Sequence, residues 1–383
     1  MEDKLTFEEL YKSYEICLKN KKRKNGTYSF VNMDLCLNLY NLLEEINERK
    51  YVPSPSNCYV VKYPAYREIF AAQFKDRIVQ HFYMEELGEI LNSGLVKGCS
   101  SCIKCRGTTY ALQMLKDYVK SITKNGRNGC YFLRIDLSGY LMSIKREIVC
   151  NKFIDLINSK YKGKHKDLLL YLTPIIFLNN SAENCVYKCN EKLRARVPER
   201  RKMQKDSEYG MAIGNLTSQA GSNLNLNDFD HYVVEKLKLP NYIRYVDDIV
   251  IISNNKEQLK NALPRMIKKL AETHQSISVK KTKIDTVYHG VPFLGKVTYP
   301  YRGYQTPSKQ VYIRVMQKAK NITYTDIDNL ISKTNSEIGF LKNYNCRKLI
   351  FQYANEIQKR TKNVIKFNKQ NFRFEKFKPN VKI

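Results

Sequence analysis

The 383-residue chain contains no tryptophan, and it has few acidic residues for its size, with 37 Asp and Glu against 66 Lys and Arg. It also lacks any run of about 18 apolar residues, the length that a membrane-spanning helix requires. The N-terminal Met1-Glu2-Asp3 has neither the basic nor the apolar region of a signal peptide. These absences argue against membrane and secreted proteins, and we expect a cytoplasmic one.

The eleven cysteines are scattered and odd in number, which is typical of reduced thiols and does not indicate a disulfide framework. One group, Cys99-Ser-Ser-Cys102-Ile-Lys-Cys105, has spacing that resembles part of an iron–sulfur or zinc site. It lacks a fourth ligand, because the nearest further pair, Cys185 and Cys189, lies about eighty residues away. The sequence favours free thiols there and leaves metal binding open.

The excess of basic residues gives a formal net charge of +29. Basic groups occur at 19–24, at 200–202 and near the C-terminal end of the sequence. Solubility needs only a modest excess of one sign, and self-repulsion at this charge works against a compact state. The composition therefore favours a polyanionic partner, of which nucleic acid is the natural candidate.

Apolar residues recur with a helical period in several segments and with strand-like patterns in others. The region 182–209 is polar and basic without a clear period, so we expect a loop there. We predict helices over 31–49, 74–92, 107–124, 145–158, 256–272, 325–343 and 346–366, with a further helix opening at 210–214 and running to 237. We predict strands over 58–63 and 131–136, a hairpin over 242–253, and strands near 276–297.

Three aspartates stand where apolar strands end. Asp136 ends the run 131–136, and Asp247 and Asp248 occupy the turn of the 242–253 hairpin. Such a pair is often an ordinary turn, yet two like charges side by side are unfavourable unless cations neutralise them. If the strands are neighbours in one sheet, the acids converge, and their oxygens suit Mg²⁺, with Mn²⁺ as an alternative. Two ions about 3.5 to 4 Å apart activate a primer 3′-hydroxyl and stabilise pyrophosphate, so the pattern predicts nucleotidyl transfer.

Three boxes of the sequence resemble those of reverse transcriptases. Tyr245-Val-Asp-Asp248 is similar to the YxDD box, and Leu133-Arg-Ile-Asp-Leu-Ser-Gly-Tyr-Leu-Met-Ser-Ile144 resembles the box that supplies the first aspartate. Gly210-Met-Ala-Ile-Gly-Asn-Leu-Thr-Ser-Gln219 resembles the box that lies against the incoming nucleotide and template. Their order and spacing also agree, which makes three boxes more specific than one.

The resemblance covers nearly the whole chain and implies an α+β, right-hand polymerase fold. Such a fold has fingers, a palm of antiparallel sheet plus helices, and a helical thumb. The implied boundaries are 1–130 for the N-terminal region and fingers, 131–300 for the palm, and 301–383 for the thumb and basic tail. Residues 140–210 within the palm stretch would be partly fingers or an insertion.

The resemblance also implies roles for individual side chains. Lys62 and Arg67 would clamp the triphosphate, a task suited to a planar and always charged guanidinium. Tyr140 would stack under the sugar and exclude a 2′-hydroxyl, although Leu141 could hold that position and Tyr140 could be a core residue. The full implied set is catalytic and metal-binding Asp136, Asp247 and Asp248; catalytic Lys281, with Lys280 as a rival; nucleotide-binding Lys62, Arg67, Tyr140, Ile213, Gly214 and Gln219; and a primer grip of Phe293, Leu294 and Gly295.

Several segments resemble the polymerases of diversity-generating retroelements of bacteria and phages. They are Arg67-Glu-Ile-Phe-Ala-Ala72, 136–144, 213–219 and 335–344. Most reverse transcriptases have glutamine where Ile213 stands, and isoleucine cannot hydrogen-bond near the nucleotide, so base selection should loosen. The resemblance implies a template RNA, a cDNA primer, dNTPs and a small basic accessory protein in a bacterial or phage-infected cell, with errors at template adenines.

Two alternatives remain open. One is a phage-defence reverse transcriptase, and the other, from a different class, is a non-catalytic RNA-binding protein that keeps the fold. The chain continues only briefly past the expected thumb, which disfavours a group II intron maturase and leaves no room for an RNase H or integrase domain. The Asn-Ala-x-x-His box that is usual in retron enzymes is missing.

Overall fold

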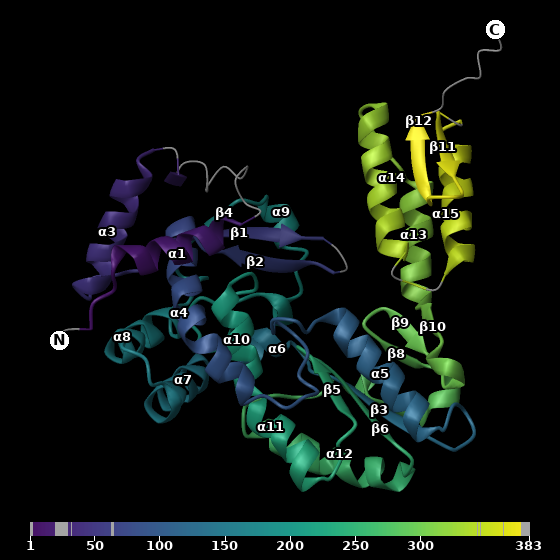
Figure 1. Ribbon diagram of the computed structural model, residues 1–383, viewed down its shortest axis with the longest axis horizontal. Helices are drawn as coiled ribbons and strands as arrows, with labels where there is room; N and C mark the ends of the chain where they lie inside the picture. Colours follow the sequence, from purple (N-terminus) through teal and green to yellow (C-terminus); the bar gives the residue numbers. More distant parts are fainter. Residues whose placement is uncertain are drawn as a thin grey trace. The chain divides into compact units, whose positions relative to one another are not determined.

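The computed structural model describes residues 3–19, 30–31, 33–62, 65–342, 344, 346–362 and 364–376. Helices and mainly antiparallel sheets are mixed along the chain, which confirms the predicted α+β class (Figure 1). The chain forms two compact units: unit 1 comprises Met1–Gly107, Arg134–Ile249 and Lys260–Thr282, and unit 2 comprises Thr108–Leu133, Val250–Leu259 and Lys283–Ile383. The division into fingers, palm and thumb stays a prediction.

Most helices of unit 1 follow the predicted segments. They are α1 (Phe7–Leu18), α3 (Leu35–Asn47), α4 (Phe74–Ser93), α6 (Tyr140–Ser143), α7 (Arg146–Lys160), α8 (Lys166–Phe177), α9 (Glu191–Arg194), α10 (Leu216–Asn225) and α11 (Asn227–His231). The helices α1, α6, α8 and α9 were not predicted. A capping box starts α1, because the Thr6 side chain accepts from Glu9 N at 3.3 Å and Glu9 accepts from Thr6 N at 3.0 Å.

The segment 182–209 corrects the prediction of a loop. It contains a short strand, β4 (Cys185–Tyr187), which pairs in parallel with β1 (Ser56–Val61), the partner of β2 (Arg67–Ala71) in an antiparallel hairpin. The buried Glu68 accepts from Arg194 Nε at 2.9 Å and from Met203 N at 3.2 Å. The partners that fix the structure of this segment lie 126 to 135 residues away in the sequence, so the local pattern could not reveal them.

A four-stranded sheet carries the predicted aspartates. Its order is β5 (Tyr242–Tyr245), β6 (Asp248–Ser253), β3 (Tyr131–Asp136) and β7 (Lys283–Thr286). The strand at 131–136 and the hairpin over 242–253 are thereby confirmed. Five consecutive residues of β6 are buried, which is typical of a strand covered on both faces.

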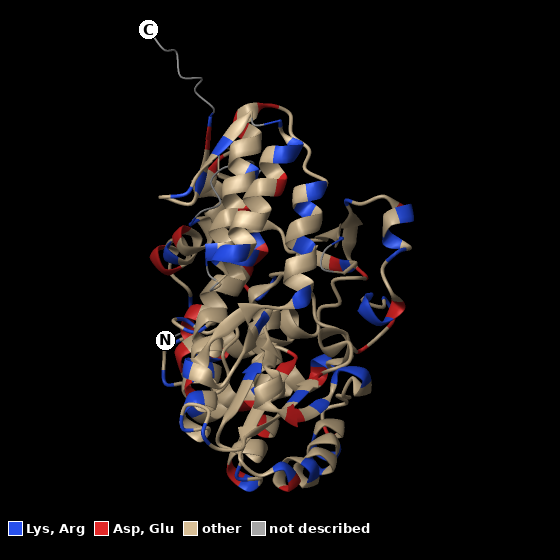
Figure 2. Ribbon diagram, turned by 90° about the vertical axis from the view of Figure 1, so that its right-hand side faces the viewer, with Lys and Arg blue, Asp and Glu red and all other residues tan. Residues whose placement is uncertain are grey.

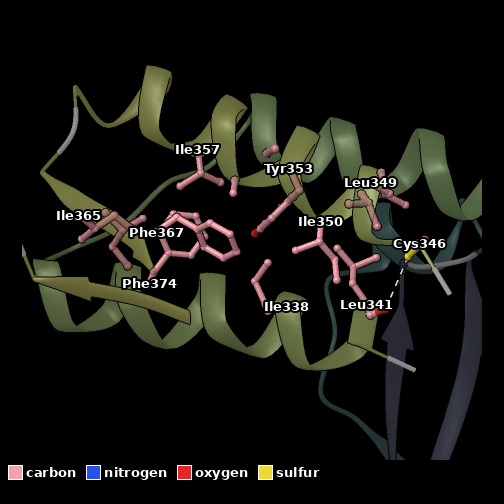
Figure 3. Packing of buried hydrophobic residues seen from close by; sticks show 14 of the residues in the cluster. Ile338, Leu341, Cys346, Leu349, Ile350, Tyr353, Ile357, Ile365, Phe367 and Phe374 are labelled. Atoms are coloured by element: carbon pink, nitrogen blue, oxygen red, sulfur yellow. Dashed lines mark hydrogen bonds between the residues drawn. The ribbon is translucent and has the colours of Figure 1, made fainter. Parts of the chain in front are cut away.

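Unit 2 includes α5 (Thr108–Ile122), a three-stranded sheet and a helical region. The sheet has the order β10 (Gln305–Pro307), β9 (Lys296–Thr298) and β8 (Val291–Phe293). The helices α13 (Lys309–Lys320), α14 (Ile327–Lys342) and α15 (Arg347–Arg360) enclose an apolar core with the hairpin β11 (Ile365–Asn368) and β12 (Arg373–Lys376) (Figure 3). The helix α12 (Lys256–Ala271) has residues in both units.

The prediction of a helix from 346 to 366 is wrong at its end. Helix α15 stops at Arg360, and Lys362 has a left-handed φ of 46°. Ile365 and Phe367 then alternate inward along β11, and Phe374 of β12 joins them in the core. The inward Ile365 and Phe367 suit a half-buried strand, so tertiary packing decided between helix and hairpin.

Basic residues are spread over the helices and loops of the chain rather than confined to one segment (Figure 2). None of the described helices is both long enough and apolar enough to cross a membrane.

Candidate active site

Main-chain hydrogen bonds bring the ends of three segments together in unit 1. Leu137 N donates to Asp247 O at 3.1 Å, which joins the end of β3 to the β5–β6 turn. Ser278 N donates to Asp136 O at 2.7 Å and so places the segment with Lys281 beside the same strand. The predicted convergence of Asp136 with the pair at 247 and 248 is therefore seen in the backbone.

Cationic side chains hold two of the three carboxylates. Lys281 Nζ lies 2.8 Å from both oxygens of Asp136, although the lysine side chain itself is 54% exposed. Arg134 forms a two-point contact with Asp248, with Nε 3.1 Å from Oδ1 and Nη2 3.2 Å from Oδ2. Arg134 and Asp136 are two residues apart on β3 and share one face of the strand.

The pKa of Asp247 is strongly raised by its surroundings in this site. Burial raises its pKa to about 6, and the neighbouring Asp136 and Asp248 add to the shift while Lys281 opposes it. Burial also raises the pKa of Asp248, against the opposing effect of Arg134. A site that disfavours its own negative charge in this way would gain from a bound cation.

Among the described residues, no three His, Cys, Asp or Glu side chains are gathered as they are around a bound metal ion. The donor chemistry nevertheless fits hard divalent ions, because carboxylate oxygens at adjacent strand ends are the ligands that Mg²⁺ prefers. Lys281 and Arg134 form ion pairs with Asp136 and Asp248. A metal ion at this site would compete with these two cations for the same carboxylate oxygens.

The turn that carries Asp247 is itself strained. Val246 has φ of 57°, a left-handed conformation that is costly for a β-branched residue and is usually taken by glycine at this place in a two-residue hairpin. Its N–H donates to Ser101 Oγ at 3.1 Å, and its carbonyl accepts from Arg244 Nη1 at 3.3 Å. The surroundings therefore clamp the Val246 residue from both sides.

Arg244 belongs to a fully buried polar cluster behind that turn. Its Nε and Nη2 donate to both oxygens of Asp230 at 2.6 to 3.0 Å, and both side chains are 0% exposed. Tyr242 donates to the same carboxylate at 2.5 Å, and Asn223 Oδ1 accepts from Arg244 at 3.2 Å. Burial opposes the charge of Arg244, but Asp230 raises its pKa well above the ordinary value, so the guanidinium stays charged.

The segment around Cys99 forms the edge of this cluster. Arg244 N donates to Gly98 O and Ser100 N donates to Arg244 O, both at 3.0 Å, so the segment runs along β5. A Cβ at Gly98 would lie 2.1 Å from Tyr242 O, which leaves room only for glycine. The buried Cys99 thiol contacts Arg244 and Asn223, whereas Cys102 and Cys105 are exposed. Cys99 therefore has a packing role in the cluster.

The predicted nucleotide-binding residues lie on elements that contact one another within unit 1. Phe70 N of β2 donates to Ile213 O at 2.9 Å, which joins the strand of Arg67 to the box at 210–219. A Cβ at Gly214, where φ is 121°, would lie 2.9 Å from Phe70 O. Lys62, which directly follows β1, and Gln219, on α10, are exposed. Their roles toward a nucleotide stay predictions.

Tyr140 is buried at 3% exposure, and its hydroxyl donates to the Ser222 carbonyl of α10. Burial raises the pKa of this phenol, as expected for a core tyrosine. This placement argues against a ring that stacks under a sugar. The alternative residue, Leu141, is half-buried, and its carbonyl accepts from Met211 N at 2.8 Å. The role of either side chain toward a sugar stays a prediction.

The predicted primer grip lies in unit 2. Phe293 ends β8 and is buried, and the tight turn of Leu294 and Gly295 has positive φ at both residues, 47° and 79°. Gly295 O accepts from Ser308 N at 2.9 Å, which ties the turn to the start of α13. The turn is thus fixed in shape, and its contact with a primer stays a prediction.

Sequence reasoning did not identify Arg134, Ser101, Asp230 or Arg244 as parts of the site. A signal existed for Arg244, because a charge inside the apolar run 242–253 must find a buried partner. No local signal pointed to Asp230 or Ser101, which lie 14 and 143 positions before Arg244.

Comparison with known proteins gives a matching family and several similar solved structures. Residues 62–298 match the family described as reverse transcriptase (RNA-dependent DNA polymerase). Among solved structures, telomerase from Candida albicans in complex with a fragment of telomeric RNA is similar at a TM-score of 0.49 and 10% identity, over 83% of this chain and 56% of that chain. Apo telomerase from Candida tropicalis, truncated from its C-terminal domain, gives 0.48 and 11%, over 66% and 55%. The chain thus spans little more than half the length of these telomerases, and no curated protein matches it by sequence.

Proposed function

Because the chain belongs to the family of reverse transcriptases, which are RNA-dependent DNA polymerases, we propose that it extends a DNA primer along an RNA template by nucleotidyl transfer. The observation that carries the proposal is the arrangement of Asp136, Asp247 and Asp248. Hydrogen bonds fix the backbones of Asp136 and Asp247 at adjacent strand ends, and burial raises the pKa of Asp247 and Asp248. Such a site suits a reaction whose substrates arrive with divalent cations.

Each residue of the site would have a distinct task. Asp136, Asp247 and Asp248 would hold two Mg²⁺ ions, which when bound supply activation of the primer 3′-hydroxyl and stabilisation of the leaving pyrophosphate. Lys281, held 2.8 Å from Asp136, would donate a proton to the pyrophosphate. Arg67 and Lys62 would bind the triphosphate, and Arg134 would orient Asp248 through its two-point contact.

The direct test is dNTP incorporation on a primed RNA template with Mg²⁺. Asp247→Asn should lower the rate by about 10² to 10³ or more, because it removes a ligand of the reacting centre. Asp167→Asn, on the exposed face of α8, is the matched control and should keep the wild-type rate. Absence of incorporation by the wild-type chain would favour the alternative, an RNA-binding protein that keeps the fold.

We further propose that the enzyme is of the diversity-generating type, copying a template RNA into cDNA with errors at adenines and working with a small basic accessory protein. The resemblance of 213–219 to that type supports this subtype. The position of Ile213 is consistent with it, since the Ile213 carbonyl is held by Phe70 of the strand that carries Arg67. An apolar side chain at that place offers no hydrogen bond that could select a base.

Fidelity measurements test the subtype. Ile213→Gln should lower misincorporation opposite template adenine, while the other three template bases serve as an internal control. Equal error frequencies at adenine in the two enzymes would remove Ile213 as the cause and leave the polymerase assignment untouched.

A further inference from the structure

One loop of unit 2 displays aromatic rings to solvent. It joins β9 to β10 and has the sequence Tyr299-Pro-Tyr-Arg-Gly-Tyr304. The Tyr301 side chain is 63% exposed and the Tyr304 side chain is 50% exposed. Neighbouring exposed rings on one short loop leave apolar surface uncovered, and such surface commonly marks a place where something binds.

The loop has a fixed shape. Tyr299 N donates to Tyr304 O at 2.8 Å, and Tyr304 N donates to Tyr301 O at 3.0 Å. The tight turn at its centre has left-handed φ at Arg302 and Gly303, 52° and 62°. Gly303 sits directly on α5, since a Cβ there would lie 2.3 Å from Lys116 Cγ. The rings are therefore carried by a closed turn seated on a helix.

Tyr301 is also held by its own neighbours. Its ring lies against the backbone of Gly126, where a Cβ would be 3.0 Å from the ring. Tyr288 meets it edge-on, with ring centroids 6.2 Å apart, and the Tyr288 hydroxyl donates to Asn128 O at 2.8 Å. A ring fixed in this way loses little freedom when a ligand stacks on it.

These rings border a basic hollow of about 710 Å³. Within the described residues, it is lined by Lys120, Asn125, Tyr301, Arg302 and Tyr304, with two cations and no carboxylate. The adjoining stretch of sequence, 116–127, has four basic residues and one acid. Flat rings beside cations, with no acid in the described lining, match a ligand that has both flat apolar faces and negative charge.

We propose that this hollow, which we call the tyrosine hollow, binds single-stranded nucleic acid. Unpaired bases stack on Tyr301 and Tyr304, while Lys120 and Arg302 contact phosphates. Stacking requires bases free of a duplex, and it tolerates any sequence because every base has a flat face. This site rests on the proposed function only in supplying a nucleic-acid ligand, and it lies in the other compact unit from the three aspartates.

The test measures fluorescence anisotropy of labelled 12-nucleotide oligouridylate, and of oligothymidylate of the same length, with the full chain. Tyr301→Ala and Tyr304→Ala should each weaken binding by about fivefold or more, and Tyr301→Phe should bind like the wild type because stacking needs the ring only. Tyr324→Ala is the matched control, since Tyr324 is 43% exposed in the same unit. Tighter binding of oligouridylate would indicate template RNA as the ligand, and tighter binding of oligothymidylate would indicate cDNA.

Charge and position give two further readouts. Arg302→Gln should reduce the slope of log affinity against log salt by about one, because one phosphate contact is lost. Photocrosslinking of 4-thiouridine in the oligomer should label the peptide that contains 299–304. The proposal would be overturned if both alanine variants bound the oligomers with wild-type affinity and no crosslink to that peptide formed. That result would favour a protein as the ligand of the tyrosine hollow. Failure of the polymerase assignment would appear separately, as absent dNTP incorporation with oligomer binding intact.

Discussion

Two carboxylates close to the β5–β6 turn have opposite surroundings. Asp230 lies behind the turn, fully buried, and accepts hydrogen bonds from Arg244 and Tyr242. Asp247 lies in the turn, half-buried, among Asp136 and Asp248, and burial together with these neighbours raises its pKa to about 6. The protein itself neutralises the negative charge of Asp230, whereas the charge of Asp247 would be neutralised by a bound cation.

The different surroundings of Asp230 and Asp247 serve two requirements of this small region: a fixed turn backbone and a carboxylate that favours cation binding. The Val246 backbone is strained, at a cost of order 1 to 3 kcal/mol, and it holds only if its surroundings determine it. The Arg244 cluster meets that requirement because its charges and donors are paired. Asp247 can then remain poorly compensated without the turn rearranging, which is the state that favours cation binding.

The largest effect on this comparison should come from breaking the buried pair. Arg244→Met leaves Asp230 charged and buried, and Asp230→Leu does the same to Arg244, so each should lower the free energy of unfolding by about 3 to 5 kcal/mol. The double variant should lose clearly less than the sum, because neither charge is then stranded. Urea unfolding of the four proteins measures the coupling. Losses that simply add would mean that the two residues do not stabilise each other.

A smaller effect of opposite sign is expected at Asp247. Its pKa is about 6 in the folded chain against 3.8 as the ordinary value, so the folded state binds more protons between these values and stability falls as pH rises. The penalty is complete above about pH 6 and absent below about 3.8. Asp247→Asn should therefore raise the free energy of unfolding without divalent ions by about 1 to 3 kcal/mol at pH 8, and by about half as much at pH 5.

The control for this experiment is Asp167→Asn, which should show no such gap at either pH. Addition of Mg²⁺ should narrow the gap by stabilising the wild type only. A stabilisation by Asp247→Asn that is equal at pH 8 and pH 5 would show that the carboxylate charge is not its source.

The sequence predicted the convergence of the three aspartates but not the residues that hold them in place. Asp136 and the pair in the 242–253 hairpin could be predicted, because strand patterns and turn position are local signals. The end of α15, the strand β4 and the buried state of Tyr140 depend on contacts between distant segments, such as that of Tyr140 with Ser222. The same holds for Arg244, whose need for a partner is visible in sequence although the identity of Asp230 is not.

The smallest expected change in the free energy of unfolding concerns the hydrogen bond between Ser101 and the Val246 backbone of the turn. Ser101 is buried, accepts from Val246 N at 3.1 Å and donates to Asn223 Oδ1 at 3.1 Å. Ser101→Ala leaves the Val246 N–H without that acceptor and should lower the free energy of unfolding by about 1 kcal/mol. Ser100→Ala is the matched control, because the buried Ser100 hydroxyl donates to Gly98 O at 3.1 Å and, among the described residues, forms no hydrogen bond to Val246.

If the bond to Val246 serves the turn, the two serine variants should differ in catalysis more than in stability. Ser101→Ala should require more Mg²⁺ for half-maximal dNTP incorporation, since Asp247 follows Val246 directly and its carboxylate would be held less firmly. Ser100→Ala should keep the wild-type Mg²⁺ requirement. An equal Mg²⁺ requirement in both variants would limit the role of the Ser101 hydroxyl to stability.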